Sequence, residues 1–443
     1  MGLGTYRITG GESLNGEMHV VGGKNAVLPI LAAAVLNAGV SVLRNCPRIS
    51  DTHTAVAILR AIGCHADFDG HEILVDSAFA DTSEVPEALV REMRAAIIFL
   101  GSMLGRFGKV CIGYPGGCEL GARPIDLHLK ALRRMGATIT EANGFVCAEA
   151  VRLHGARVHL DFPSVGATEN IMLAAVLAEG ETVICNAARE PEIVDLQGFL
   201  NAMGAKVCGA GTDTVTIEGV AVLRPVEYTV MPDRIVAGTM LVAAAMTRGE
   251  IILRDVVPGH LTAVLSRLAE TGCTVRECDG GTGLYLRAAG AIQPVDCIRT
   301  LPHPGFPTDM QSQFMAYLCL ANGTSIFTET VFESRNKHVG ELRRMGADIV
   351  LSQDGQTAII KGLGTGAGSG GNGAGKSRTL ALRGAVVEAR DLRGGAALVL
   401  AGLAAEGETV VLNTSHIERG YEAFDRDLAA LGARIAVEMA AEK

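Results

Sequence analysis

Charged and hydroxyl residues stand at the start of six otherwise uncharged stretches, and each group lies 14 to 16 residues before a glycine. Such stretches are long enough for buried helices, whose N-termini offer free N–H groups and a partial positive charge to anions. Capping explains Ser164, Asp309 and Asp391, but it does not explain cations, because positive charge opposes the dipole there. The pattern predicts a site for phosphate and carboxylate groups that draws on Lys24 with Asn25, Arg94, Ser164, Asp233 with Arg234, Asp309, and Asp391 with Arg393.

A glycine-rich loop adds a thiol to this set. Residues 114–123 read Tyr-Pro-Gly-Gly-Cys-Glu-Leu-Gly-Ala-Arg and present Cys118 ahead of Pro124, a residue that suits the first position of a helix. The glycines and Arg123 favour a functional thiol over a small packing residue, which is the role we expect for the other ten cysteines. Arg419, in a turn, is either a ligand-binding cation or a solvated charge. The 11 histidines show no HxxxH or HExxH spacing, so we expect no catalytic metal.

Two short phrases repeat along the chain and indicate the elements that must hold these residues. One phrase, mostly a large apolar residue followed by Gly and then Ala or Cys, is centred on Gly63, Gly136, Gly204, Gly272, Gly346 and Gly432. The other, Gly before a short β-branched run, begins 23 to 28 residues earlier, at Gly39, Gly108, Gly180, Gly249, Gly323 and Gly407. Each repeat of about 70 residues is therefore predicted to contain a helix, a strand, a second helix and further strands. The first helix is predicted to end at a glycine C-cap. In the first repeat we predict helices at 26–38 and 52–62 and a strand at 40–43.

The composition is that of a large acidic globular protein with small partners. The chain has 443 residues, 48% of them hydrophobic and 20% charged. Its net charge of −9 argues against a general nucleic-acid or anionic-membrane surface. The first 25 residues lack a signal-peptide pattern, and we interpret the uncharged segment 26–43 as soluble core rather than a membrane insertion. Eleven scattered cysteines without a CxxC pair favour reduced thiols in the cytoplasm.

A Gly-rich insert at 362–379 explains the long last repeat. It contains Gly370, Gly375, Lys376 and Ser377 in the spacing of a phosphate-binding P-loop. A P-loop should lie between a strand and a helix, whereas low-complexity sequence precedes this motif and a β-like segment follows it. We therefore expect a surface insert outside the site.

Longer motifs, which together cover the chain, resemble those of the UDP-N-acetylglucosamine 1-carboxyvinyltransferases, a branch of the enolpyruvyl transferases. They lie at residues 23–26, 115–124, 164–168, 188–192, 232–234, 306–310, 391–393 and 419–421. The resemblance implies an α/β fold: a two-domain inside-out α/β barrel of six βαβαββ repeats, three per domain, with buried central helices. It also implies a first domain at 23–230 that carries the Cys118 loop. The second domain comprises 1–22 and 231–443, and the substrate cleft lies between the two.

The implied reaction moves the enolpyruvyl group of phosphoenolpyruvate to the 3-hydroxyl of UDP-N-acetylglucosamine and releases phosphate. This is the first committed step of peptidoglycan synthesis, and it needs no cofactor. Among the implied catalytic residues Cys118, Asp309, Lys24 and Arg419, Cys118 holds the proton donor's position and can form a phosphoenolpyruvate adduct, while Asp309 is the base. Phosphoenolpyruvate contacts carry over to Lys24, Asn25, Arg123, Arg393 and Arg419. Nucleotide-sugar contacts carry over to Arg94, Arg123, Pro124, Ile125, Asp126, Leu127, Ser164, Val165, Gly166, Asp309 and Val331. No oligomer is implied.

Two alternatives stay open. A shikimate-3-phosphate enolpyruvyl transferase shares the fold and chemistry, but it would show Lys-Ser in place of Lys24-Asn25 and would lack the cysteine loop. A non-catalytic paralogue that binds nucleotide sugars is disfavoured by the intact Lys24, Cys118, Asp309 and Arg419. One departure concerns Phe162, which stands where some members have Lys, so one diphosphate contact is absent or supplied elsewhere.

Overall fold

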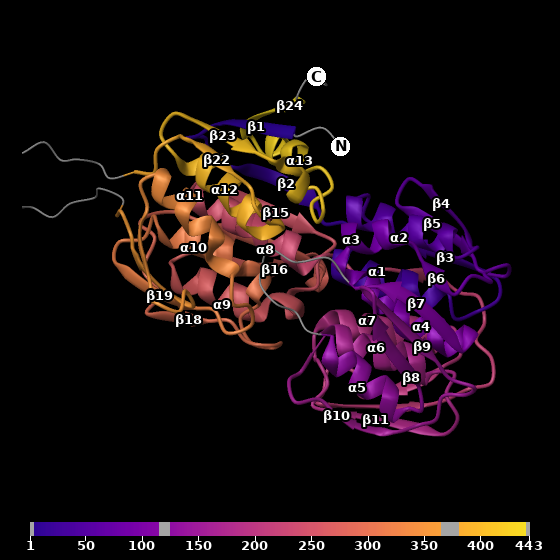
Figure 1. Cartoon of the computed structure of the whole chain (residues 1–443). Helices are drawn as coiled ribbons and strands as arrows, with labels where there is room; N and C mark the ends of the chain where they lie inside the picture. Colours follow the sequence, from indigo (N-terminus) through magenta and orange to yellow (C-terminus); the bar gives the residue numbers. More distant parts are fainter. Residues whose placement is uncertain (1–3, 115–124, 365–380, 440–443) are drawn as a thin grey trace, which may run out of the picture. The chain divides into compact units, whose positions relative to one another are not determined.

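The computed structural model describes residues 4–114, 125–364 and 381–439 (Figure 1). These residues form two compact units. The first unit runs from Val21 to Asp233, and the second contains residues 4–20 together with those from Arg234 onward. Each unit has its own cluster of buried hydrophobic side chains. The chain therefore builds two separate cores, and we describe each unit by itself.

The six sheets formed by the described residues all have four strands and one topology. An edge strand pairs parallel with its neighbour, and the other two pairings are antiparallel. In the first unit the sheets are β14-β3-β5-β4, β6-β7-β9-β8 and β10-β11-β13-β12. Their strands are β3 (Val40–Arg44), β4 (His65–Asp69), β5 (Glu72–Asp76), β6 (Glu84–Val85), β7 (Lys109–Gly113), β8 (Thr138–Ala142), β9 (Phe145–Glu149), β10 (Arg157–His159), β11 (Glu181–Cys185), β12 (Lys206–Cys208), β13 (Thr214–Glu218) and β14 (Glu227–Thr229).

The second unit repeats this arrangement in sheets β22-β23-β1-β24, β16-β17-β15-β2 and β18-β19-β21-β20. The strands are β1 (Gly4–Thr9), β2 (Asn15–His19), β15 (Glu250–Arg254), β16 (Thr274–Cys278), β17 (Gly283–Arg287), β18 (Cys297–Arg299), β19 (Thr324–Thr328), β20 (Asp348–Leu351), β21 (Thr357–Lys361), β22 (Val386–Glu388), β23 (Glu408–Leu412) and β24 (Arg434–Met439). The predicted α/β fold of six repeats is confirmed.

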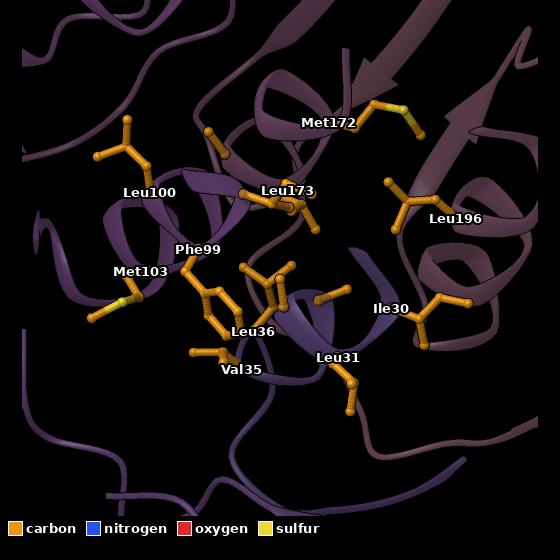
Figure 2. Packing of buried hydrophobic residues seen from close by; sticks show 14 of the residues in the cluster. Ile30, Leu31, Val35, Leu36, Phe99, Leu100, Met103, Met172, Leu173 and Leu196 are labelled. Carbon is orange, nitrogen blue, oxygen red and sulfur yellow. The ribbon is translucent and has the colours of Figure 1, made fainter. Parts of the chain in front are cut away.

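The helices of the first unit fall into buried and half-buried sets. The helices are α1 (Lys24–Ala34), α2 (Ser50–Ala61), α3 (Glu87–Glu92), the 3-10 helix η1 (Arg94–Ile98), α4 (Phe99–Phe107), α5 (Asp126–Arg134), α6 (Val165–Ala175) and α7 (Pro191–Ala202). Side chains of α1, α4 and α6 are almost entirely buried after their first residues, except near the end of α4. Figure 2 shows Ile30 and Leu31 of α1 and Phe99 of α4 in the same core as Leu173 of α6 and Leu196 of α7. Small apolar side chains allow these helices to pack closely.

The second unit has the same division. Its helices are α8 (Arg234–Met246), α9 (Thr262–Glu270), α10 (Gln311–Leu318), α11 (Val339–Arg344), α12 (Leu392–Ala404) and α13 (Phe424–Ala430), with 3-10 helices η2 (Pro258–Leu261), η3 (Asp279–Gly281), η4 (Thr308–Met310), η5 (Arg335–His338) and η6 (Thr414–His416). Helices α8, α10 and α12 are buried along nearly their whole length and contact one another. The buried helices predicted from six uncharged stretches are therefore present in both units.

The first repeated glycine phrase marks a helix end. All six glycines have φ between +95° and +104°, and each follows the second helix of its repeat. In the first repeat, the Gly63 N–H donates to Arg60 O and the Cys64 N–H donates to Leu59 O. The same pair of bonds recurs in the other five repeats. This is the Schellman ending, which needs a left-handed residue and therefore favours glycine.

The second glycine phrase does not act as predicted. We expected each first helix to end at this glycine, but only Gly108 directly follows its helix as a left-handed cap. Helix α1 ends at Ala34, five residues before Gly39, and α8 ends at Met246, before Gly249. A Cβ on Gly249 would lie 1.9 Å from Leu14 O. Here glycine is required because another backbone approaches closely, and not because φ is positive.

The cysteines also differ from the expectation of free thiols. Cys111 on β7 and Cys147 on β9 face each other in register and form a disulfide. Their separation of 36 residues gives no signal of this pairing, because only the β7–β9 register brings them together. The expectation of free thiols is therefore wrong for this pair. The Cys118 loop and most of the Gly-rich insert lie outside the described residues.

The described residues lack two features that would bear on function. None of their helices has the length and apolar character needed to cross a membrane. Over the same ranges, no group of three or more His, Cys, Asp or Glu residues could hold a metal ion.

Candidate functional site

Lys24 is a fixed cation at the start of α1. Its Nζ lies 2.6 Å from Asp51 Oδ2 on α2, and the two side chains are only 12% and 4% exposed. The Lys24 backbone N–H donates to Asp233 Oδ2 at 3.1 Å. A carboxylate thus neutralises the lysine that the helix dipole would otherwise repel. Asp233 stands directly before α8, where we predicted it, and its side chain also accepts this bond from the first turn of α1.

The start of α6 is suited to an anion. Ser164 precedes the helix, and its carbonyl accepts from the Thr168 N–H and hydroxyl, both at 2.8 Å. Within the described chain the Ser164 hydroxyl makes no capping hydrogen bond, so it leaves the first-turn N–H groups to other acceptors. Val165 and Gly166 are half-buried in this turn. A helix start of this kind binds phosphate or carboxylate oxygens.

Three more predicted residues of the first unit directly precede His128 of α5 in the chain. Ile125 and Asp126 stand at the N-terminal end of that helix, and Leu127 follows them. Burial and, to a smaller extent, the positive charge of Arg94 in η1 lower the pKa of His128 to about 4, against the opposing effect of Asp126. Arg94 therefore lies close enough to α5 for its charge to act on that imidazole.

The second unit holds Asp309 between two buried arginines. Asp309 Oδ1 lies 2.9 Å from Arg335 Nη2, and Oδ2 lies 3.0 Å from Arg393 Nη2. Both arginine side chains are 2% exposed, while the Asp309 side chain is 26% exposed. Each guanidinium thus pairs with one oxygen of a carboxylate that still reaches the surface of the unit. Two adjacent cations favour the ionised carboxylate, the form that accepts a proton.

The position of Arg393 follows from its place at the start of α12. Asp391 caps this helix, because its Oδ1 accepts from the N–H groups of Arg393 and Gly394 at 3.0 and 2.9 Å. The Arg393 guanidinium also lies 5.4 Å from the ring centre of Tyr421. Arg419, two residues earlier in the chain than Tyr421, is half-buried. The arginine predicted from the Asp391–Arg393 motif is therefore held rigidly toward Asp309.

Val331 is placed by a buried glutamate. Glu329 Oε1 accepts from the Val331 N–H at 2.8 Å and from the Phe332 N–H at 3.0 Å. Its other oxygen accepts from the Thr308 hydroxyl at 2.9 Å. Glu329 thus links Val331 to Thr308, the residue directly before Asp309. The same glutamate therefore positions both Val331 and Asp309, two of the predicted nucleotide-sugar contacts.

Some residues of these clusters carried no signal in the sequence. Arg335, Asp51, Glu329 and His128 were not among the predicted site residues. None of them opens one of the six uncharged stretches, so only the folded arrangement reveals them. The pattern of helix starts did identify Lys24, Ser164, Asp309 and Arg393. Cys118, Arg123 and Pro124 lie outside the described residues.

Known proteins resemble the chain over its full length. The family model of EPSP synthase (3-phosphoshikimate 1-carboxyvinyltransferase) matches residues 8–428. UDP-N-acetylglucosamine 1-carboxyvinyltransferase 2 of Caldanaerobacter subterraneus subsp. tengcongensis is 50% identical over 433 residues, which cover 98% of this chain and 99% of that protein. The chain belongs to the UDP-N-acetylglucosamine 1-carboxyvinyltransferase family. Within this family, the Myxococcus xanthus protein is 46% identical over 436 residues, covering 98% of this chain and 99% of its own.

Solved structures agree with the fold of this family. The enolpyruvyl transferase NikO from Streptomyces tendae matches with a TM-score of 0.86 and 25% identity over 100% of both chains. EPSP synthase from Acinetobacter baumannii matches with a TM-score of 0.74 over 99% of this chain and 100% of its own, and at 20% identity it supports the fold alone. The predicted family and the enolpyruvyl transferase fold are confirmed.

Proposed function

We propose that this protein is a UDP-N-acetylglucosamine 1-carboxyvinyltransferase that joins the enolpyruvyl group of phosphoenolpyruvate to the 3-hydroxyl of the sugar, the first step of peptidoglycan synthesis. The observation that carries the proposal is that relatives named for this activity match at 46–50% identity along nearly the whole chain. The arrangement of Asp309 between two buried arginines adds a chemical reason.

Asp309 is the proposed base. As a carboxylate it accepts the proton of the sugar 3-hydroxyl while that oxygen bonds to C2 of phosphoenolpyruvate. Cys118, the proposed acid, gives a proton to C3, which yields a tetrahedral phosphate ester. Loss of a proton from C3 and cleavage of the C2–O bond to phosphate then restore the double bond and release phosphate. Cys118 also forms the proposed covalent adduct with phosphoenolpyruvate.

Fixed cations are the proposed contacts of phosphoenolpyruvate, which carries a phosphate and a carboxylate. Lys24 is already anchored at a helix start by Asp51, and Arg393 is buried and oriented by Asp391. Such pre-organised donors stabilise developing negative charge without having to reorganise during the reaction. Asn25, Arg123 and Arg419 complete this proposed set.

UDP-N-acetylglucosamine is the proposed second substrate. The α6 start, with Ser164, Val165 and Gly166, is the proposed diphosphate contact, because its N–H groups and dipole attract phosphate oxygens. Arg94, the segment 123–127, Asp309 and Val331 are the other proposed contacts. We propose that this activity takes place in the cytoplasm.

The decisive experiment measures phosphate release with both substrates present. We expect release that requires UDP-N-acetylglucosamine and is not supported by shikimate 3-phosphate. Dependence on shikimate 3-phosphate would favour the alternative transferase. Tight binding of UDP-N-acetylglucosamine without phosphate release would favour a non-catalytic binding protein.

The Cys118→Ala variant tests the proposed acid. We expect it to lose at least about 100-fold in turnover, the typical contribution of a positioned proton donor, and to escape alkylation by the epoxide phosphonate fosfomycin. Cys297→Ala, which removes an exposed cysteine, is the control and should react as the wild type does. Stoichiometric labelling of the Cys118→Ala protein at another cysteine would contradict the assignment.

A further inference from the structure

The imidazole of His128 faces the first turn of α6. His128 is on α5 and is 6% exposed. A Cβ built on Gly166 would lie 3.1 Å from His128 Cε1 and 3.5 Å from Nε2. The Cε1–Nε2 edge of the ring is therefore directed at the helix start, and glycine at 166 gives it room. Both elements belong to the first unit.

The tautomer of this ring is fixed by Asn170 on α6. Asn170 Oδ1 accepts from the Gly101 N–H at 2.7 Å, and Nδ2 donates to Ile97 O at 3.0 Å. These two backbone bonds orient the carboxamide, so that Asn170 Nδ2, and not Oδ1, lies 2.8 Å from His128 Nδ1. An NH₂ group only donates, and therefore Nδ1 must accept. The ring proton is then on Nε2.

The ring is neutral at physiological pH and has a donor to spare. Burial and the charge of Arg94 lower the pKa of His128 to about 4, so that the imidazole carries one proton, on Nε2. No hydrogen-bond acceptor for Nε2 is found among residues 4–114, 125–364 and 381–439. The side chain is nine-tenths buried, and its Nε2–H has no protein partner over these residues, so this donor is available to a ligand or to water. It is aimed at a helix start that attracts anions.

We propose that the Nε2–H of His128 donates a hydrogen bond to an anionic oxygen of the nucleotide-sugar ligand at the start of α6. This proposal rests on the proposed function, since it refines the diphosphate contact. The donor adds no charge to a buried place, while the helix supplies the positive potential. Phe162, two residues before Ser164, is apolar and 44% exposed, so this side chain provides no cation. Asn170 acts as the positioning residue.

The test compares His128→Asn with His128→Gln. The Gln amide reaches the place of Nε2 and can donate there, whereas the Asn amide reaches only the place of Nδ1. We expect His128→Asn to weaken UDP-N-acetylglucosamine binding about 10- to 100-fold by calorimetry, as for other hydrogen bonds to charged groups, and His128→Gln to recover most of it. Uridine, which has no phosphate, should bind all variants equally. His65→Asn on the exposed strand β4 is the matched control.

Two results would overturn the proposal. One is unchanged UDP-N-acetylglucosamine binding in a folded His128→Asn protein. The other is an equal loss for uridine without recovery in His128→Gln, which would mean that His128 only supports the fold. If neither variant folds, histidine-selective ¹⁵N NMR of the wild type decides. We expect a protonated Nε2 whose N–H signal moves downfield on UDP-N-acetylglucosamine addition, and a protonated Nδ1 or an unmoved signal would refute the proposal. Failure of the proposed function itself would appear separately, as a wild type without phosphate release.

Discussion

The two units share one arrangement of helices and sheets, but the charge states of their buried polar groups differ. In the first unit Glu169 of α6 and His128 of α5 are both buried, and burial shifts their pKa values toward the neutral forms, to about 8 and about 4. In the second unit Arg335 and Arg393 remain charged and pair with Asp309. Each unit also holds an exception, because Lys24 pairs with Asp51 in the first unit, and burial lowers the pKa of His338 in the second unit to about 4.

This difference shows how one scaffold carries two kinds of electrostatic environment. A buried titratable group either loses its charge or finds a partner of opposite charge. Neutral groups suit a site where a helix start and uncharged donors bind phosphate oxygens. The two arginines keep the carboxylate of the second unit ionised, which is the form that the proposed base requires. The repeats supply the helix starts, and the residues there set the local electrostatics.

Breaking the charged cluster should have the largest effect. We expect Asp309→Asn to lower kcat about 10²- to 10⁴-fold, because the amide cannot accept the proton of the sugar hydroxyl. It should also lower the free energy of unfolding by up to about 3 kcal/mol, since two buried arginines lose their carboxylate, a loss reduced by the partial exposure of Asp309. Steady-state phosphate release and thermal unfolding measure the two effects.

The exposed pair of Asp348 with Lys361 gives the control for this substitution. Asp348→Asn removes a carboxylate from the surface of the same unit and should leave kcat and stability nearly unchanged. A fully active Asp309→Asn protein would remove Asp309 from the proposed catalytic role.

Neutral Glu169 predicts a pH-dependent stability in the first unit. Burial, with Glu192 and then Glu190 as further causes, raises its pKa from 4.5 to about 8. Above pH 4.5 the unfolded chain loses this proton while the folded protein keeps it, so stability falls as the pH rises toward 8. We expect Glu169→Gln to raise the free energy of unfolding at pH 8 by roughly 3–5 kcal/mol and to have little effect at pH 4.

Chemical unfolding at pH 4, 6 and 8 measures this difference. Glu149→Gln, at an exposed position on β9, should show no such trend. An equal gain for Glu169→Gln at every pH would contradict a shifted carboxyl group and would indicate an uncharged packing effect instead.

The smallest expected effect tests whether the helix endings of the two units are equivalent. Gly204 in the first unit and Gly346 in the second have φ of +97° and +95°, and a Cβ on either would meet nothing within 4 Å. Only the left-handed backbone should oppose a side chain, so Gly204→Ala and Gly346→Ala should each lower the free energy of unfolding by about 1–2 kcal/mol.

Denaturant unfolding of the two alanine variants measures these losses. Asparagine tolerates the left-handed region better than alanine, so Gly204→Asn and Gly346→Asn should each recover part of the loss. Alanine losses that differ between the units by more than about 1 kcal/mol would show that the two Schellman endings are not equivalent.

The sequence determined the repeats, the buried helices and many polar residues at their starts. These features are local: a Schellman ending needs a glycine, a buried helix needs an uncharged stretch, and a helix start with Lys24 or Asp309 follows from residues close in the chain. The ends of the first helices could not be predicted from nearby residues. Gly249, for example, is required by the close approach of the Leu14 backbone, which is far away in sequence.

Only the tertiary structure decided which polar groups meet. Asp51 on Lys24, Arg335 on Asp309, Asn170 on His128 and the Cys111–Cys147 disulfide all join residues separated by at least 26 positions. Such pairs depend on how helices and strands pack, and no periodicity encodes them. The side-chain types identified the chemistry, but packing determined which buried groups stay charged, which become neutral, and which donor is left for a ligand.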